Sequence, residues 1–195
     1  MSARFQAIQR RLAWAGLTAL GVALPASTLA DPADETPVLG AGGGAHRLHF
    51  DVADAEVAPD GRTDEPAGYV RVGSIRSEHR LYGQWTVIPS SDYLVSTLTA
   101  NADLVWSAAP RITVFAGAGA GGITLSLNGT NSRDTKPVVT AQAGAILAIT
   151  DRLGVELGLR QMVTRLQTER DVAGDSVSID LNRLGAATLG ANLRF

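Results

Sequence analysis

Apolar and polar residues alternate with a period of two along most of this chain, a pattern that predicts β-strands with one apolar face. The carboxyl end shows it most clearly. There the apolar face consists of Leu189, Ala191, Leu193 and Phe195, while the other face carries Asn192 and Arg194. A run of this length can cross a bilayer, which needs roughly 9 to 11 residues of strand.

Eight such strands are predicted, at residues 46–57, 67–76, 80–88, 93–106, 111–126, 137–150, 153–168 and 178–195. An even number is typical of bacterial transmembrane barrels. Short turns are expected at 77–79, 107–110 and 151–152 on the side of the two termini, and longer polar connections at 58–66, 127–136 and 169–177 on the outer side. The apolar residues change parity at Gly121–Gly122, which predicts a bulge or the end of a strand there.

The two faces differ in what they carry. The apolar face of the strands consists of Leu, Val, Ile and Ala, whereas the other face carries polar and charged residues, including a lumen charge network predicted for Asp103, Glu156, Arg160 and Arg194. On the first strand we expect His49 to face the lumen. Backbone groups in hydrocarbon must all be paired, and a closed barrel is the sheet that achieves this. The predicted fold is therefore all-β: an eight-stranded antiparallel up-and-down transmembrane barrel, with a soluble antiparallel sheet as the alternative.

Before the strands, the chain has the order of a secretory signal peptide. Arg4, Arg10 and Arg11 precede an apolar run at 12–24, and a stretch of small residues ends at Ala30. We expect residues 1–30 to be removed, residues 31–44 to form a flexible leader, and residues 45–195 to form the barrel. Without the three arginines, 14 Lys and Arg face 19 Asp and Glu, a net charge near −5 that argues against a nucleic-acid partner.

Two stretches resemble known proteins. The end of the chain, LGAATLGANLRF (184–195), resembles the carboxyl-terminal signal of bacterial outer-membrane barrels. The stretch AQAGAILAITDRLGVELGLRQ (141–161) resembles the penultimate hairpin of the small-barrel superfamily that contains opacity-type adhesins and the transmembrane domain of outer-membrane protein A. The resemblance implies a location in the cell outer membrane, with outer-membrane lipid and the insertion machinery as partners; the insertion signal would comprise Leu189, Ala191, Leu193 and Phe195.

Candidate chemistry is sparse. The histidines are His46, His49 and His79; the first two fall on opposite faces of a strand, so no metal site is expected. Catalysis would need a base beside a nucleophile, and we expect all three histidines near the periplasmic end, away from an outer active site. The glycine-rich run at 117–122 lacks the Gly-Lys-Ser/Thr of a phosphate loop and is expected to make room in the lumen. No cofactor and no catalysis are therefore predicted.

The function predicted from these features is structural or a surface interaction. Binding to an unidentified extracellular ligand would reside in the outer connections, through Arg62, Asp64, Arg133, Asp134, Lys136, Glu169 and Arg170. Two alternatives stay open. One is a narrow porin-like channel for small solutes or ions, and the other is a lipid-modifying outer-membrane enzyme.

Overall fold

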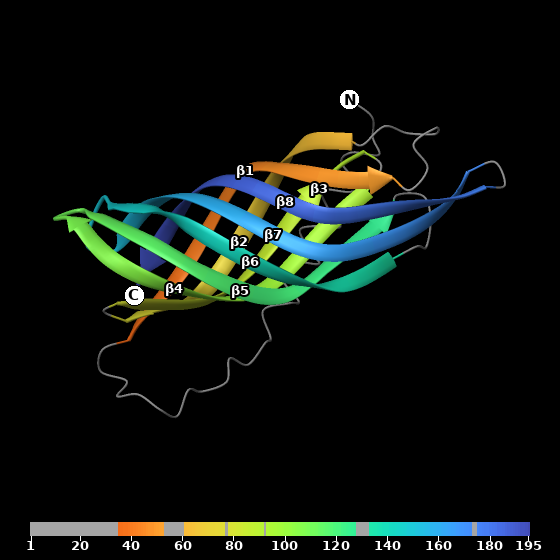
Figure 1. Cartoon of the computed structure of the whole chain (residues 1–195). Coiled ribbons are helices and arrows are strands. Elements are labelled where there is room, and N and C mark those ends of the chain that lie inside the picture. Colours follow the sequence, from red (N-terminus) through yellow and green to blue (C-terminus); the bar gives the residue numbers. More distant parts are fainter. Residues whose placement is uncertain (1–34, 53–60, 77, 92, 128–132, 173–174) are drawn as a thin grey trace. The chain divides into compact units, whose positions relative to one another are not determined.

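The structure, a computed structural model, describes residues 35–52, 61–76, 78–91, 93–127, 133–172 and 175–195. These residues form one closed sheet (Figure 1). Its strands are β1 (Thr36–Val52), β2 (Gly61–Arg76), β3 (His79–Pro89), β4 (Tyr93–Ala109), β5 (Ile112–Leu127), β6 (Arg133–Ala148), β7 (Leu153–Val172) and β8 (Asp175–Arg194).

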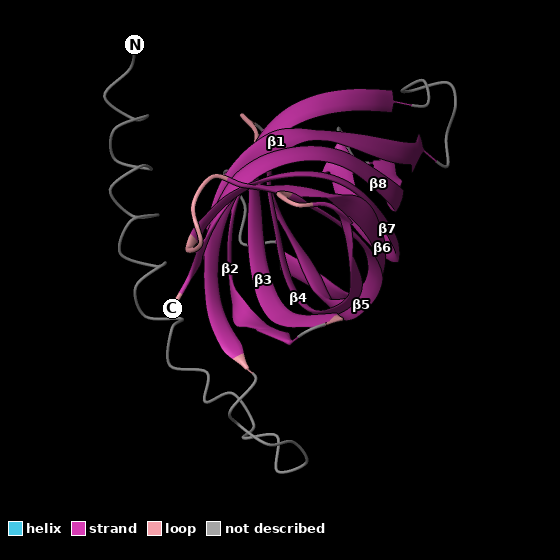
Figure 2. Ribbon diagram, turned by 90° about the vertical axis from the view of Figure 1, so that its left-hand side faces the viewer, coloured by secondary structure: helices cyan, strands magenta, loops and turns pink. Residues whose placement is uncertain are grey.

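Each strand pairs antiparallel with the next, and β8 returns to pair with β1. That closing pair runs from Val38 opposite Arg194 to Val52 opposite Ile179, and the Phe195 N–H adds a hydrogen bond to the Pro37 carbonyl oxygen at 3.2 Å. Figure 2 shows the strands curving round to form the wall of the barrel. The predicted eight-stranded up-and-down barrel is confirmed, including its closure by the carboxyl-terminal strand.

The first strand begins earlier than the sequence suggested. The prediction of a flexible leader at 31–44 is wrong for residues 36–44, which belong to β1 and pair with both β2 and β8. Its glycines are needed there. A Cβ on Gly42 would lie 2.6 Å from the Tyr69 hydroxyl and would collide with the Leu189 carbonyl oxygen. The glycine run therefore makes room for a large inward side chain rather than marking a linker.

The outer connections also differ from the prediction. Arg62 and Asp64 lie in β2, Arg133, Asp134 and Lys136 lie in β6, and Glu169 and Arg170 lie in β7, not in loops. Pairing with neighbouring strands supports the backbone there, for example between β7 and β8 as far as Val172 opposite Asp175. Polar composition marked these segments as loops, but backbone pairing does not depend on side-chain polarity.

No bulge interrupts β5 at Gly121–Gly122, so that prediction is wrong. The register with β4 is continuous there, and its irregularity lies instead between Ser107 and Ala109. Ile123 is fully buried because the strand keeps its course and turns apolar side chains into the lumen. The faces of β1 are likewise reversed: Leu48 points inward and Arg47 outward.

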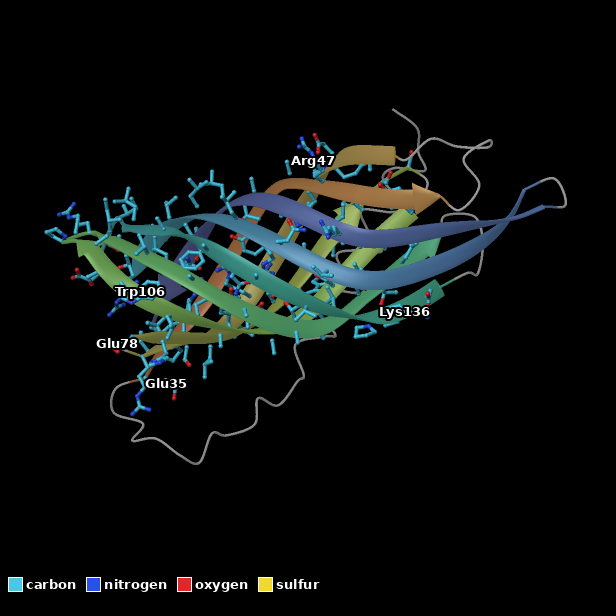
Figure 3. All side chains as sticks on the ribbon, in the orientation of Figure 1. Glu35, Arg47, Glu78, Trp106 and Lys136 are labelled. Carbon is cyan, nitrogen blue, oxygen red and sulfur yellow. The ribbon has the colours of Figure 1, made fainter. Side chains whose placement is uncertain are left out.

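The outside of the barrel is apolar. Large exposed hydrophobic residues occur on all eight strands or beside them, among them Leu39, Val70, Leu81, Leu98, Ile112, Val139, Leu157, Leu159 and Leu189. Phe195, the last residue, is exposed. Trp106 is also exposed and lies toward the same end of the barrel (Figure 1 and Figure 3). Soluble monomers rarely expose apolar patches beyond a few hundred Å². This exterior is suited to lipid, with aromatic residues at its margin.

No helix that is long and apolar enough to cross a membrane is found in the part of the chain that the structure describes.

Candidate functional site in the barrel lumen

The interior of the barrel changes in character along each strand. On β3 the inward side chains are, in order from the turn between β2 and β3, Arg80, Tyr82, Gln84, Thr86 and Ile88, and all of them are buried. On β7 the order is Glu156, Gly158, Arg160 and Met162. Charged groups therefore lie toward the end of the barrel where β1 begins and β8 ends, and hydroxyl and amide groups lie in the middle. Apolar side chains lie toward the opposite end, which we call the outer end.

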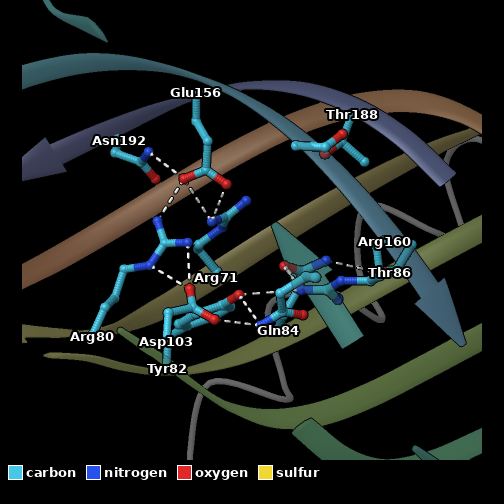
Figure 4. Close-up of polar contacts among 12 residues, drawn as sticks. Arg71, Arg80, Tyr82, Gln84, Thr86, Asp103, Glu156, Arg160, Thr188 and Asn192 are labelled. Atoms are coloured by element: carbon cyan, nitrogen blue, oxygen red, sulfur yellow. Dashed lines mark hydrogen bonds and ion pairs between the residues drawn. The ribbon is translucent and has the colours of Figure 1, made fainter. Parts of the chain in front are cut away.

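Five buried charged residues form what we call the ionic cluster: Arg71, Arg80, Asp103, Glu156 and Arg160. Glu156 is its centre (Figure 4): Arg71 Nη1 donates to its two oxygens at 2.7 and 2.9 Å, and Arg80 Nη1 donates at 2.5 Å. Arg80 also holds Asp103 through Nε and Nη2, at 2.9 and 2.6 Å. Such charge-assisted contacts are stronger than neutral hydrogen bonds.

Aromatic rings support the guanidinium groups of the cluster. The Tyr82 ring lies 5.1 Å from the Arg71 guanidinium carbon and 4.8 Å from that of Arg80. Phe115 lies 4.3 Å from Arg80, and Tyr69 lies 4.7 Å from Arg71. Cation–π contacts are stronger at desolvated sites than at exposed ones, and the rings and guanidinium groups named here are all buried.

Toward the outer end the lumen is closed by the outer apolar cluster, which consists of Leu48, Ile88, Val95, Ile123, Leu125, Val138, Met162 and Leu184. None of these side chains is more than 4% exposed. A smaller apolar group, Val105, Phe115 and Ile146, lies on the other side of the ionic cluster. The interior of an eight-stranded barrel is just wide enough for side chains to fill it, and side chains fill this lumen except for a cavity of about 10 Å³ beside Arg160.

Solved structures with this architecture share little sequence with the chain. Neisserial surface protein A matches with a TM-score of 0.65 at 15% identity, over 82% of this chain and 97% of that one. Outer membrane protein H from P. aeruginosa gives 0.54 at 21%, over 84% and 100%. The N-terminal β-barrel domain of Pseudomonas aeruginosa OprF gives 0.52 at 11%, over 82% and 97%.

The chain has the fold of the small outer-membrane β-barrels. No protein-family model matches the chain, and a search of the curated proteins finds no match. The likeness therefore lies in the backbone arrangement, and the interior of this small barrel has to be understood from its own residues.

Of the four residues predicted as lumen charges, the structure places Asp103, Glu156 and Arg160 in the ionic cluster. Within the described ranges Arg160 donates to two neutral oxygens, Tyr82 Oη at 3.2 Å and Gln84 Oε1 at 3.0 Å. Arg194 is half-buried at the end of β8 and joins no ion pair among the described residues; its neighbour on the same face, Asn192, reaches Glu156 instead at 2.9 Å.

Arg71 and Arg80, the two cations that hold the carboxylates, were not predicted as lumen charges. A signal existed for both, because Arg71 stands between the outward Val70 and Val72, and Arg80 precedes the outward Leu81. Period-two alternation places both arginines on the inner face. What the pattern could not supply was the partner across the lumen.

The predicted surface residues lie at the outer end, but not as one site. Asp64 accepts from Arg47 Nε at 2.8 Å and from Nη2 at 2.9 Å, on the outer wall. The Lys136 Nζ atom lies 3.7 Å from Asp134 Oδ2, and Arg133 is exposed. The side chains of Arg62, Glu169 and Arg170 lie outside the described side chains. Ion pairs at the surface, such as that of Arg47 with Asp64, contribute little to stability.

The histidines occupy different places from those expected. Because β1 begins at Thr36, His46 lies well along the strand toward the outer end, where it is buried in the lumen beside Leu48 on the same face. The placement argument against an outer active site is therefore wrong for His46. His79 begins β3 and is exposed, and the His49 side chain lies outside the described side chains. No group of three or more metal-ligating side chains occurs in the described ranges.

Proposed function

We propose that the protein is a non-conducting barrel of the Gram-negative outer membrane that acts at the cell surface. The fold and the apolar outer wall support the location. In this arrangement the start of β1 and the end of β8 face the periplasm, and the outer ends of all eight strands face the exterior. The interior has a structural role, and contact with partners takes place at the outer end.

The observation that carries the proposal is the outer apolar cluster. Its side chains come from β1, β3, β4, β5, β6, β7 and β8 and meet across the lumen. An ion would have to shed its water to pass them, and transfer of a charge into an apolar region is strongly unfavourable. This opposes the porin-like alternative. The burial of His46 opposes the enzyme alternative, because a catalytic base must reach its substrate.

Conductance across a planar bilayer tests the closed lumen. We expect the purified, heat-modifiable protein to give no discrete current steps. Met162→Ala, which shortens one side chain of the outer apolar cluster, is the comparison. Steps with the native protein that change size in this variant would overturn the proposal, whereas steps identical in both arise from a contaminating porin.

The surface role is supported by the hairpin of β7 and β8. Pairing of β7 with β6 ends at Val138 opposite Thr164, while its pairing with β8 continues to Val172. Among the described residues, the β7 edge thus has no partner in β6 beyond Thr164. The pairing of β8 with β1 ends at Ile179, opposite Thr168 of β7, so beyond Thr168 the hairpin is a two-stranded ribbon. Free strand edges can accept an extended peptide as an added strand. We place the surface contact on this ribbon, which carries Glu169 and Arg170.

Labelling of intact cells tests the location and orientation. The chain has no cysteine, so single cysteines can be introduced without background. Arg133→Cys at the start of β6 should react with a membrane-impermeant maleimide, and Arg111→Cys in the turn between β4 and β5 should not. Both positions are exposed arginines, so they are a matched pair. Equal labelling of the two, or labelling of Arg111→Cys alone, would contradict the proposed orientation.

A further inference from the structure

The ionic cluster is not electrically balanced. It contains three guanidinium groups, those of Arg71, Arg80 and Arg160, and two carboxylates, those of Asp103 and Glu156. Arginine stays protonated in proteins. Each of the five residues is more than nine-tenths buried. A buried charge without a counter-ion is costly, so the surplus positive charge needs an explanation.

Arg160 carries the surplus. Glu156 is shared by Arg71 and Arg80, and Asp103 is held by Arg80. Arg160 instead donates from Nη2 to the hydroxyl of Tyr82 and the amide oxygen of Gln84, both uncharged. No carboxylate in the described part of the chain forms an ion pair with Arg160.

A small cavity adjoins this residue. Its volume is about 10 Å³, and its lining includes Arg71, Arg160, Tyr82, Gln142 and Phe115. Two buried donors on these residues, Nη1 of Arg160 and Nε of Arg71, have no hydrogen-bond partner among the residues that the structure describes. Two guanidinium groups therefore line a space that holds about one water-sized particle, and each has a donor to spare.

We propose that this cavity binds a small monovalent anion of halide size, held by Arg160 and Arg71. One such anion accepts from both spare donors and brings the ionic cluster to three positive and three negative charges. Sulfate and phosphate are too large for the space. The competing occupant is a water molecule, which would satisfy the donors and also donate to the unpaired Oε1 of Gln142, but would leave the charge uncompensated.

Thermal unfolding of the full chain in detergent micelles tests the site in solution. The midpoint is measured in sodium chloride, sodium bromide and sodium gluconate at equal ionic strength, since gluconate cannot enter the cavity. A bound halide at ten to a hundred times its Kd raises the midpoint by about 3 to 10 °C, and the rise saturates with concentration. Arg160→Gln should abolish the difference between halide and gluconate. Arg47→Gln, an exposed arginine on the outer wall, should retain it.

Crystals grown in bromide test the site directly and do not depend on the folding of any variant. The expected result is an anomalous peak in the cavity, within hydrogen-bond reach of Arg160 Nη1 and Arg71 Nε. A cavity that holds only water, without anomalous signal, overturns the proposal. Midpoints that coincide in halide and gluconate overturn it as well.

Discussion

Glu156→Gln is the substitution that most directly tests the balance of forces inside the barrel. Its carboxylate accepts hydrogen bonds from Arg71 at 2.7 and 2.9 Å, from Arg80 at 2.5 Å and from Asn192 at 2.9 Å. Glutamine has nearly the same shape, so it leaves no cavity. It removes one negative charge from a site that is 3% exposed and turns one acceptor oxygen into a donor.

The expected cost follows from these contacts. Removing one partner of a buried ion pair destabilises a protein by about 3 to 5 kcal/mol, because the remaining charge stays buried. Two arginines depend on Glu156, but the amide oxygen of glutamine can still accept from one of them. We therefore expect the free energy of unfolding to fall by about 3 kcal/mol, near the lower end of that range.

Urea-induced unfolding from lipid vesicles provides the measurement, with tryptophan fluorescence and heat-dependent gel mobility as two readouts of the same transition. Asp64→Asn is the control. It removes the carboxylate of an ion pair whose side chains are more than half exposed, and such surface pairs contribute little to stability.

A loss below about 1 kcal/mol in Glu156→Gln would refute the reasoning, because it would mean that water or reorganisation screens the site as it does at a surface. Addition of Arg71→Gln to Glu156→Gln removes one guanidinium as well. Because this restores the original surplus of one positive charge, the double variant should be less destabilised than the sum of the two single variants.

Three further predictions concern the strand interior, the outer wall and the chain end. Gly117→Ala should lower the free energy of unfolding by about 1 to 3 kcal/mol, since the added Cβ would collide with an Asp103 carboxylate oxygen. Gly122→Ala on the same strand should change it by no more than about 0.5 kcal/mol, because the nearest atom to its added Cβ, Thr135 Cγ2, is 3.9 Å away. Equal losses for the two variants in urea unfolding would contradict this difference in space. Leu159→Arg, on the lipid-facing wall, should cost about 2 to 4 kcal/mol in vesicles, and a neutral result would argue against burial of this wall in lipid. Phe195→Ala should keep the free energy of unfolding in vesicles within about 1 kcal/mol of the native value, because Phe195 is 68% exposed. The same variant should reduce the fraction of heat-modifiable protein in cells, because Phe195 belongs to the predicted insertion signal. An unchanged fraction would refute that role.

The strand count and the closure of the barrel could be predicted from the sequence. Alternation is a local property: successive side chains of a pleated strand point to opposite sides whatever the strand pairs with. On β7, alternation alone thus assigns Leu157 and Leu159 to the outer face and Glu156 and Arg160 to the inner face, without knowledge of any partner strand. The same logic failed at the start of β1, because glycine has no side chain with which to show a face.

The contents of the lumen could not be predicted in the same way. Arg71 and Glu156 meet although 85 residues separate them, since the stagger between strands sets which inner residues share a level. Ile123 and Leu125 are apolar residues on the inward face of β5, so they interrupt its alternation in the sequence. They face inward because they pack in the outer apolar cluster, whose other members come from other strands.

The sequence by itself determined that this chain forms strands, how many there are and which wall of most of them meets lipid, because each of these follows from the period of two within a strand. Only the tertiary structure decided where the charges pair, where the lumen closes and which guanidinium has no carboxylate, because those depend on the register among eight strands, and the register is a property of the closed barrel.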